Sequence, residues 1–176
     1  SFLFFKQNEF SKNQIHHVDE QSAQQLKLMA STRKSNALVL MNTLFEKIDT
    51  ELKNNPEKIL SDQLIERIAA LNYSFEPYNY LIGNQLSEKK WSPERGQLLL
   101  MLAKTKIDPS SFNQIKMKTS FLGADLRGAN LTGVDLSNTD LREADFRNAI
   151  LVGANLNNAI LEKASLQKTN LECTVI

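Results

Sequence analysis

The sequence predicts an α+β protein whose two kinds of structure lie in separate halves, with helices over residues 1–118 and short extended units over residues 119–176. Two observations lead to this prediction. Large apolar residues recur at every fifth position from Phe121 to Ile176 without a gap, and such repeats are the first pattern to look for. Upstream, residues 7–55 contain no glycine or proline and consist mainly of helix formers.

The composition is that of an ordinary globular protein, with 23% charged and 41% hydrophobic residues. The length of 176 residues suits one or two small domains. The formal net charge of +1 favours neither a nucleic-acid partner nor an acidic substrate. The single cysteine, Cys173, excludes an intramolecular disulfide and is compatible with either a reducing compartment or a periplasm.

The first residues are apolar and end in a cation: Phe2-Leu3-Phe4-Phe5-Lys6 follows Ser1, which is not a natural start. One interpretation is the end of a membrane span that lies upstream, with the cation at the membrane interface. The other is a helix or strand tip that is docked on its own domain. A run of four apolar residues does not decide between them.

Residues 7–54 are predicted to form one long helix, or two helices with a break near Ser31-Thr32. Their apolar residues recur mostly at three- and four-residue steps, which places them on one helical face. Asn54-Asn55-Pro56 ends the helix. A helix of this length spans ~75 Å, so we expect a second chain, a lipid-proximal stalk or a fold-back to cover its stripe. The stripe is not a strict heptad.

Shorter helices are predicted downstream from their start signals. Ser61 is a cap residue before an apolar face. Ser92-Pro93-Glu94 combines a cap, a proline at the first helical position and an acid in the first turn. Asp108-Pro109 opens a final short helix.

An aromatic cluster lies between the first two of these start signals: Tyr73, Phe75, Tyr78 and Tyr80 surround Pro77. Aromatic residues at such spacing indicate packing between helices. The alternative is a peptide groove or a ligand pocket.

The five-residue period determines the local geometry of residues 119–176. On an α-helix five residues advance about 500°, so the large residues would spread over every face. In a straight strand they would alternate between faces. One arrangement keeps them all inside: a short extended piece followed by a corner, where glycine and asparagine tolerate the positive φ of a tight turn. The predicted inward residues are Phe121, Leu126, Leu131, Leu136, Leu141, Phe146, Leu151, Leu156, Leu161, Leu166, Leu171 and Ile176, with Ala124, Ala129, Ala144, Ala149, Ala154, Ala159 and Ala164 among their partners.

The units Ala124-Asp125-Leu126-Arg127-Gly128 and Ala129-Asn130-Leu131-Thr132-Gly133 resemble the A(D/N)LXX motif of pentapeptide-repeat proteins. The resemblance covers about a third of the chain. It implies a right-handed quadrilateral β-helix with four units per coil, and so about three coils over residues 119–176.

Residues 92–99, followed by a short link and the repeats, resemble a segment of membrane-associated bacterial pentapeptide proteins. In those proteins a helical region lies between a transmembrane segment and the repeats. This resemblance implies a structural role for Arg95 and Gly96 at the junction. Together with the apolar start, it favours a bacterial membrane location. We expect this region on the cytoplasmic side, while a periplasmic location stays open.

No catalytic residue, metal ligand or cofactor site is predicted. His16 and His17 are adjacent and face different ways on a helix, and Cys173 has no histidine near it in sequence. The aspartates of the repeats precede the inward residue and are interpreted as turn support: Asp125, Asp135, Asp140 and Asp145.

If four units close a coil, residues twenty apart lie one strand spacing apart, ~4.8 Å. Arg127 then stacks beneath Arg147, beside aspartates with which both are expected to pair. Outward apolar residues break the polar exterior of the coil. The predicted partner contacts are Ile150, Val152, Ile160, Arg127 and Arg147.

These patterns favour a non-enzymatic module for protein interaction or scaffolding, with an unidentified protein partner and no nucleic acid. Self-association through the long helix or through the end of the coil is a further expectation. The alternative is a DNA mimic that protects a topoisomerase. Three coils rise only ~14 Å, and residues 119–176 carry five basic against seven acidic side chains, which disfavours it.

Overall fold

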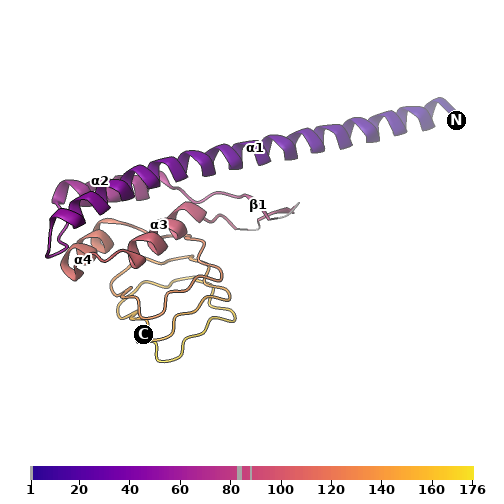
Figure 1. Ribbon diagram of the computed structural model, residues 1–176. Coiled ribbons are helices and arrows are strands. Elements are labelled where there is room, and N and C mark those ends of the chain that lie inside the picture. Colours follow the sequence, from indigo (N-terminus) through magenta and orange to yellow (C-terminus); the bar gives the residue numbers. More distant parts are fainter. Residues whose placement is uncertain (1, 83–84, 88) are drawn as a thin grey trace.

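A computed structural model describes residues 2–82, 85–87 and 89–176, with side chains described at residues 20–80, 87 and 89–176. The predictions for Ser1, for the side chains of residues 2–6, and for those of His16 and His17 therefore lie outside the described part. The elements are α1 (Phe2–Asn54), α2 (Asp62–Ser74), β1 (Leu81–Ile82), β2 (Gln85–Leu86), α3 (Pro93–Lys104) and α4 (Pro109–Lys118). Residues 119–176 coil below the helices (Figure 1).

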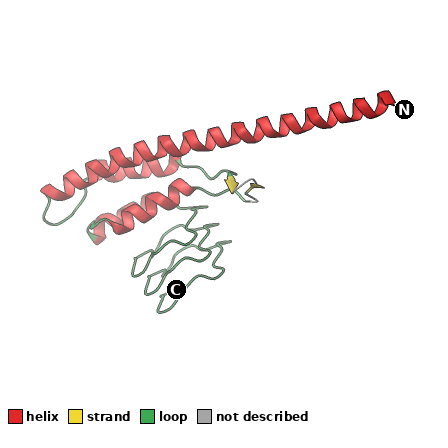
Figure 2. Cartoon of the chain, turned by 45° about the vertical axis from the view of Figure 1, so that its right-hand side comes forward, coloured by secondary structure: helices red, strands yellow, loops and turns green. Residues whose placement is uncertain are grey.

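The predicted fold class is wrong for the second half of the chain. Residues 119–176 contain no β-strand and no sheet, so the expected β-helix is absent and the regular structure of the described residues is almost wholly helical (Figure 2). The repeats consist of turns that are joined by isolated parallel bridges, such as Asp125 to Asp145. A corner of positive φ, as at Gly128 and Asn138, recurs every fifth residue. Too few residues then remain between corners for a continuous ladder.

Backbone hydrogen bonds nevertheless join each turn of the coil to the next. The N–H of Leu126 donates to the carbonyl of Asp145 at 2.9 Å, and the N–H of Asp145 donates to the carbonyl of Ala124 at 2.9 Å. Large side chains fill the interior. Those that are fully or almost fully buried are Phe121, Leu126, Leu131, Leu136, Leu141, Phe146, Leu151 and Leu156, whereas Leu161, Leu166 and Leu171 are half-buried.

Helix α1 is continuous through Ser31-Thr32 and ends at Asn54, as Pro56 predicts. Its second half packs against α2 and α3 and buries a stripe at steps of three and four residues: Ala37, Met41, Leu44, Ile48 and Leu52. Its first half projects away from the rest of the molecule (Figure 1). Of the three predicted ways to cover the stripe, the fold-back is therefore seen for the second half. Over the described residues, no helix combines the length and the apolarity that crossing a membrane requires.

The predicted helix starts are confirmed. Ser61 accepts a hydrogen bond from the N–H of Leu64, and Ser92 accepts one from the N–H of Arg95. The carboxylate of Asp108 accepts from two backbone N–H groups at the start of α4. Each cap satisfies donors that a helix leaves unpaired at its N-terminus.

Helix α3 lies on the first turn of the coil and connects it to the helical region. The N–H of Ser92 donates to the carbonyl of Gly123 at 2.7 Å, and the N–H of Asp125 donates back to the carbonyl of Ser92 at 3.1 Å. The guanidinium of Arg95, whose pKa is lowered by burial, donates to the carbonyl of Leu122 at 2.9 Å and to that of Asn72 at 3.3 Å. The predicted structural role of Arg95 at this junction is confirmed.

Candidate partner-binding groove

Three adjoining hollows, open to solvent, follow the middle of α1 where it passes residues 74–80. The first, about 510 Å³, includes Lys34 and Met41 of α1 together with Tyr78. The second, about 330 Å³, includes Met29 and Tyr78. The third, about 560 Å³, includes Met29 and Phe75. Because they share lining residues, we treat them as one surface, the α1 groove, defined by residues 26–41, 74–80 and 93–97 together with Asp125.

Arg33 fixes the two walls of the α1 groove to each other. Its guanidinium carbon lies 3.9 Å from the centre of the Tyr78 ring, within cation–π range. Its Nε is 3.3 Å from Oε1 of Glu94, and its Nη2 donates to the carbonyl of Glu76 at 2.5 Å. The Tyr78 hydroxyl donates to the same Glu94 oxygen at 3.0 Å. One buried carboxylate thus holds both a cation of α1 and a phenol of the opposite wall.

The two phenols of the groove stay protonated near neutral pH. Burial, together with the adjacent Glu94 carboxylate, raises the pKa of Tyr78 to about 12. Burial also raises the pKa of Tyr80, and so does the hydrogen bond that its hydroxyl donates to Asp125. Both phenols therefore act as hydrogen-bond donors at pH 7, to Glu94 and to Asp125.

Tyr80 connects the α1 groove to the coil. Its hydroxyl accepts a hydrogen bond from Nη2 of Arg127 at 2.8 Å, and Arg127 also donates to both carboxylate oxygens of Asp125 at 2.8 and 2.7 Å. Burial of the carboxyl opposes ionisation, but the hydrogen bonds from Arg127 and Tyr80 outweigh it and lower the pKa of Asp125. The side of the groove next to the coil is therefore a charge-paired, rigid surface.

The predicted contact residues Arg127 and Arg147 lie in this same paired network. The guanidinium of Arg147 bonds to Asp145 at 2.6 Å, which agrees with the expected pairing of the stacked arginines with aspartates. Both guanidinium carbons also lie over the ring of Trp91, at 5.5 and 5.3 Å from its centre. Their hydrogen-bonding groups are thus used largely within the molecule.

The apolar residues predicted to contact a partner lie elsewhere on the coil and do not form one patch. Ile150 is 40% exposed and bridges Asn130 and Asn170, whereas Ile160 is 50% exposed and bridges Asp140 on another wall. Val152 is half-buried. The structure places none of the three beside the α1 groove.

The repeat aspartates support turns, as predicted. Each accepts a hydrogen bond from the N–H two residues later, for example from that of Ser137 to Asp135 at 3.0 Å. The buried Lys116 also donates to the Asp135 carboxylate at 3.0 Å. The repeat pattern did not predict this contact between α4 and the coil. Within the described residues, no group of three or more His, Cys, Asp or Glu side chains is placed to hold a metal ion.

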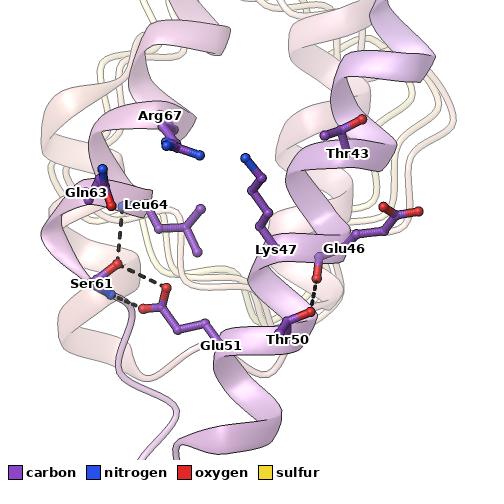
Figure 3. Close-up of a pocket in the computed structure, with 9 residues that line it drawn as sticks. All are labelled: Thr43, Glu46, Lys47, Thr50, Glu51, Ser61, Gln63, Leu64 and Arg67. Atoms are coloured by element: carbon purple, nitrogen blue, oxygen red, sulfur yellow. Dashed lines mark hydrogen bonds between the residues drawn. The ribbon is translucent and has the colours of Figure 1, made fainter.

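A separate polar hollow of about 460 Å³ lies between α1 and α2. Lys47 and Arg67 extend into it from the facing helices, and Glu51 bonds to the cap residue Ser61 (Figure 3). Its lining is polar or charged except for Leu64, and most of it is exposed, which is typical of a solvated helix surface and gives a partner little apolar area to bury.

Sequence reasoning identified one wall of the α1 groove and missed the other. Phe75, Tyr78 and Tyr80 belong to the predicted aromatic cluster and line the hollows, and Phe75 is also buried in the core, as the packing interpretation expects. On α1, Met29 is 63% and Leu40 is 51% exposed, which the single-stripe interpretation did not foresee. The available signal was the apolar runs at residues 28–30 and 37–41, which are too wide for one helical face.

Residues 118–148 and 139–172 match the family model of pentapeptide repeats, with eight copies of the repeat. No curated protein matches the chain. Proteins of this family are commonly non-enzymatic and act through protein interaction. Residues 118–172 are therefore pentapeptide repeats.

Proposed function

We propose that the protein is a non-enzymatic interaction module that holds a partner protein in the α1 groove, with the coil as its rigid base. The observation that carries this proposal is the exposure of large apolar side chains of α1 directly beside an aromatic segment: Leu28 is 68% and Met29 is 63% exposed. Clustered apolar surface beside polar side chains is typical of protein–protein contact sites.

The fixed geometry of the α1 groove supports binding further. Arg33 ties residues 74–80 to α1, and Tyr80 ties the same segment to Asp125 of the coil. A surface that is already ordered loses little conformational entropy when a partner binds. The methionine at position 29 adds an adaptable apolar contact.

Photo-crosslinking in cells tests this proposal. A crosslinker at Met29 or at Leu40 should capture one and the same polypeptide, whereas a crosslinker at Thr132 on the coil should not capture it. The purified complex should then be lost on Met29→Asp, with unchanged thermal unfolding of the variant. Different polypeptides at the two groove positions, or capture from Thr132 as well, would contradict the proposal.

We further propose that the protein works at a bacterial membrane, with this region on the cytoplasmic side. The apolar run of residues 2–5 next to Lys6 supports this, as does the resemblance of residues 92–99 to a segment of membrane-associated pentapeptide proteins. The test is fractionation of cells that express the full-length parent protein. A parent protein found wholly in the soluble fraction would overturn this half alone.

The repeat surface does not favour the DNA-mimic alternative. Three of its aspartates, Asp125, Asp140 and Asp145, are each bonded to the arginine two residues later. Such pairs neutralise the row of negative charge that imitation of a phosphate backbone needs.

A further inference from the structure

We infer that the partner in the α1 groove is a second copy of this chain, whose α1 lies antiparallel along the outer face of the first; this inference rests on the proposed function. The outer face is the exposed side of α1 opposite the buried Ala37 and Met41, which pack toward α3. Its residues share one side of the helix by their spacing: Leu28, Met29, Thr32, Ser35, Asn36, Val39, Leu40 and Thr43.

The outer face carries no charge, although it is exposed. Residues 21–45 contain three charged residues, and all three turn toward the rest of the molecule. Lys27 and Lys34 line the first hollow together with Pro93 of α3, and Arg33 lies over the aromatic wall. An exposed helix surface normally carries charged residues, whereas the core of a protein–protein interface is depleted of them. The outer face therefore has the composition of an interface.

The outer face is continuous with the α1 groove. Val39 is 64% exposed, to the same degree as Leu28 and Met29. The third hollow is lined by residues of the outer face together with Phe75. A helix that lies along the outer face therefore also covers this part of the groove and buries its apolar side chains.

The positions of the apolar residues fit a two-fold dimer. The apolar pairs 28–29 and 39–40 lie at equal distances from residue 34. When two copies of α1 run antiparallel about an axis at this residue, each pair of one copy lies level with the other pair of the second copy. Thr32 and Asn36, between the pairs, lie level with each other in the same way. A two-fold interface requires a surface that is complementary to itself in this sense.

The charge of the next turn favours the antiparallel orientation. Glu46 follows Thr43 along the outer face and is exposed. Two parallel copies in register would place this carboxylate against its own counterpart, and like charges at an interface repel. In the antiparallel pair Glu46 lies level with Ser22, and Thr43 lies level with Gln25. Uncharged polar side chains then meet the carboxylate.

The size of the surface suits a stable dimer. Residues 21–47 form about 40 Å of helix, and half the circumference of a helix offers about 700 Å² over that length. Each partner of a standard stable interface buries about 800 Å². The coil and α3 lie on the other side of α1 (Figure 1), so two copies can join without a clash. Each projecting half of α1 then gains a neighbour, which stabilises a helix that is marginal by itself.

A membrane surface fits the outer face less well. A bilayer would bury the polar groups of Thr32 and Asn36 without partners. Lys27 and Lys34 turn toward α3, away from the anionic headgroups that such cations bind in helices on a membrane surface.

Light scattering on the whole chain tests the inference. We expect a dimer whose dissociation constant rises at least about tenfold on Val39→Asp, because each new carboxylate faces an apolar pair of the other copy. The matched control is Ile160→Asp on the coil, which also replaces an exposed apolar residue by an acid and should leave the dissociation constant unchanged. Circular dichroism checks that both variants stay folded. A chain that is monomeric at about 0.1 mM, or equal effects of the two substitutions, would overturn the inference.

Disulfide formation tests the orientation. Cys173→Ser first removes the single cysteine, and Met29→Cys and Val39→Cys are then oxidised separately and as a mixture. In the antiparallel pair residue 29 lies level with residue 39, whereas two copies of residue 29 are ~15 Å apart, beyond the reach of a disulfide. The mixed disulfide should form at least about tenfold faster than either variant links to itself. Faster linkage of either variant to itself would indicate parallel helices and refute the proposed arrangement.

The crosslinks from Met29 and Leu40 separate the failure of this inference from that of the proposed function. If both capture one other protein, the proposed function holds and the second copy is refuted. If they capture no common polypeptide, the proposed function itself fails. Anionic phospholipid vesicles that dissociate the dimer would identify a membrane as the occupant and overturn the inference.

Discussion

The Cβ that Gly96 lacks would lie 2.1 Å from the carbonyl oxygen of Asp125. Helix α3 and the first turn of the coil therefore touch through their backbones, and no flexible side chain is present to move aside. The structural role that the sequence implied for Gly96 is confirmed by this contact.

Gly96→Ala should destabilise the protein by about 2 kcal/mol or more, because the added methyl overpacks a backbone contact. This change in stability is opposite in sign to that of most Gly→Ala substitutions in a helix interior, where alanine is more stable than glycine by about 1 kcal/mol. Urea unfolding measures the change, with Gln97→Ala on the exposed side of the same helix as control. A more stable Gly96→Ala variant would show that α3 does not lie on the coil.

Leu131→Asp should cost several kcal/mol, because it places an unpaired charge in the interior of the coil, where Leu131 is fully buried. Thr132→Asp, one residue later and exposed, should change stability by no more than about 0.5 kcal/mol. The two thermal midpoints give the comparison. Equal midpoints would contradict the inward register of the repeats.

Arg33→Ala should destabilise the protein by about 1–2 kcal/mol, because it leaves the buried Glu94 without its cation. Arg33→Lys should recover only part of this loss, since one ammonium cannot stack on Tyr78 and also reproduce the planar contacts to Glu94 and Glu76. A double-mutant cycle with Glu94→Gln measures the coupling, and Lys34→Ala on the exposed face is the control. Additive effects would mean that Arg33 and Glu94 do not interact.

Asp140 makes the free energy of unfolding depend on pH in the acid range. Two hydrogen bonds from Arg142, at 2.8 and 2.9 Å, and one from Ser120 lower its pKa from 3.8 to about 2 in spite of partial burial. Because the pKa of Asp140 is lower in the folded than in the unfolded state, its ionised form stabilises the folded protein at pH values above the unfolded pKa. This contribution is complete near pH 7 and is lost as the pH falls from about 4 to about 2.

Asp140→Asn should therefore reduce stability at pH 7 by about 1 kcal/mol, with the difference from the native protein vanishing near pH 2. The pKa shift alone would correspond to about 2 kcal/mol, but Arg142 is half exposed and water screens the pair. Unfolding curves between pH 2 and 7 measure this, with the exposed Glu172→Gln as control. A constant difference across the range would rule out titration of Asp140 as the cause.

The sequence predicted those features that depend on neighbouring residues. The caps Ser61, Ser92 and Asp108 act within three residues, and the five-residue register repeats the same short unit. The expected strands did not follow, because positive-φ corners such as Asn138 interrupt the ladder. The period predicts where side chains point, but it does not predict continuous strand pairing.

The α1 groove was predicted only in part, because its walls come from distant positions. The contact of Arg33 with Tyr78 joins residues 45 apart in the chain, and no local pattern specifies it. The pairing of Arg127 with aspartate followed from the stacking geometry. Its bond to Tyr80 and the position of both arginines over Trp91 depend on how these two aromatic residues lie against the coil.

The paired backbone of Ser92 has a consequence for the order of folding. Its carbonyl accepts from Asp125 in the way that each later turn of the coil bonds to the next, so the start of α3 acts as a template for the first turn. Residues 1–118 leave the ribosome before the repeats do, and an N-terminal unit that folds during synthesis offers this template to each repeat as it emerges. We therefore expect folding of the coil to start at its first turn, beside α3, and to proceed one turn at a time toward residue 176. The unpaired backbone groups are then limited to the newest turn, which reduces the chance that they pair with another chain.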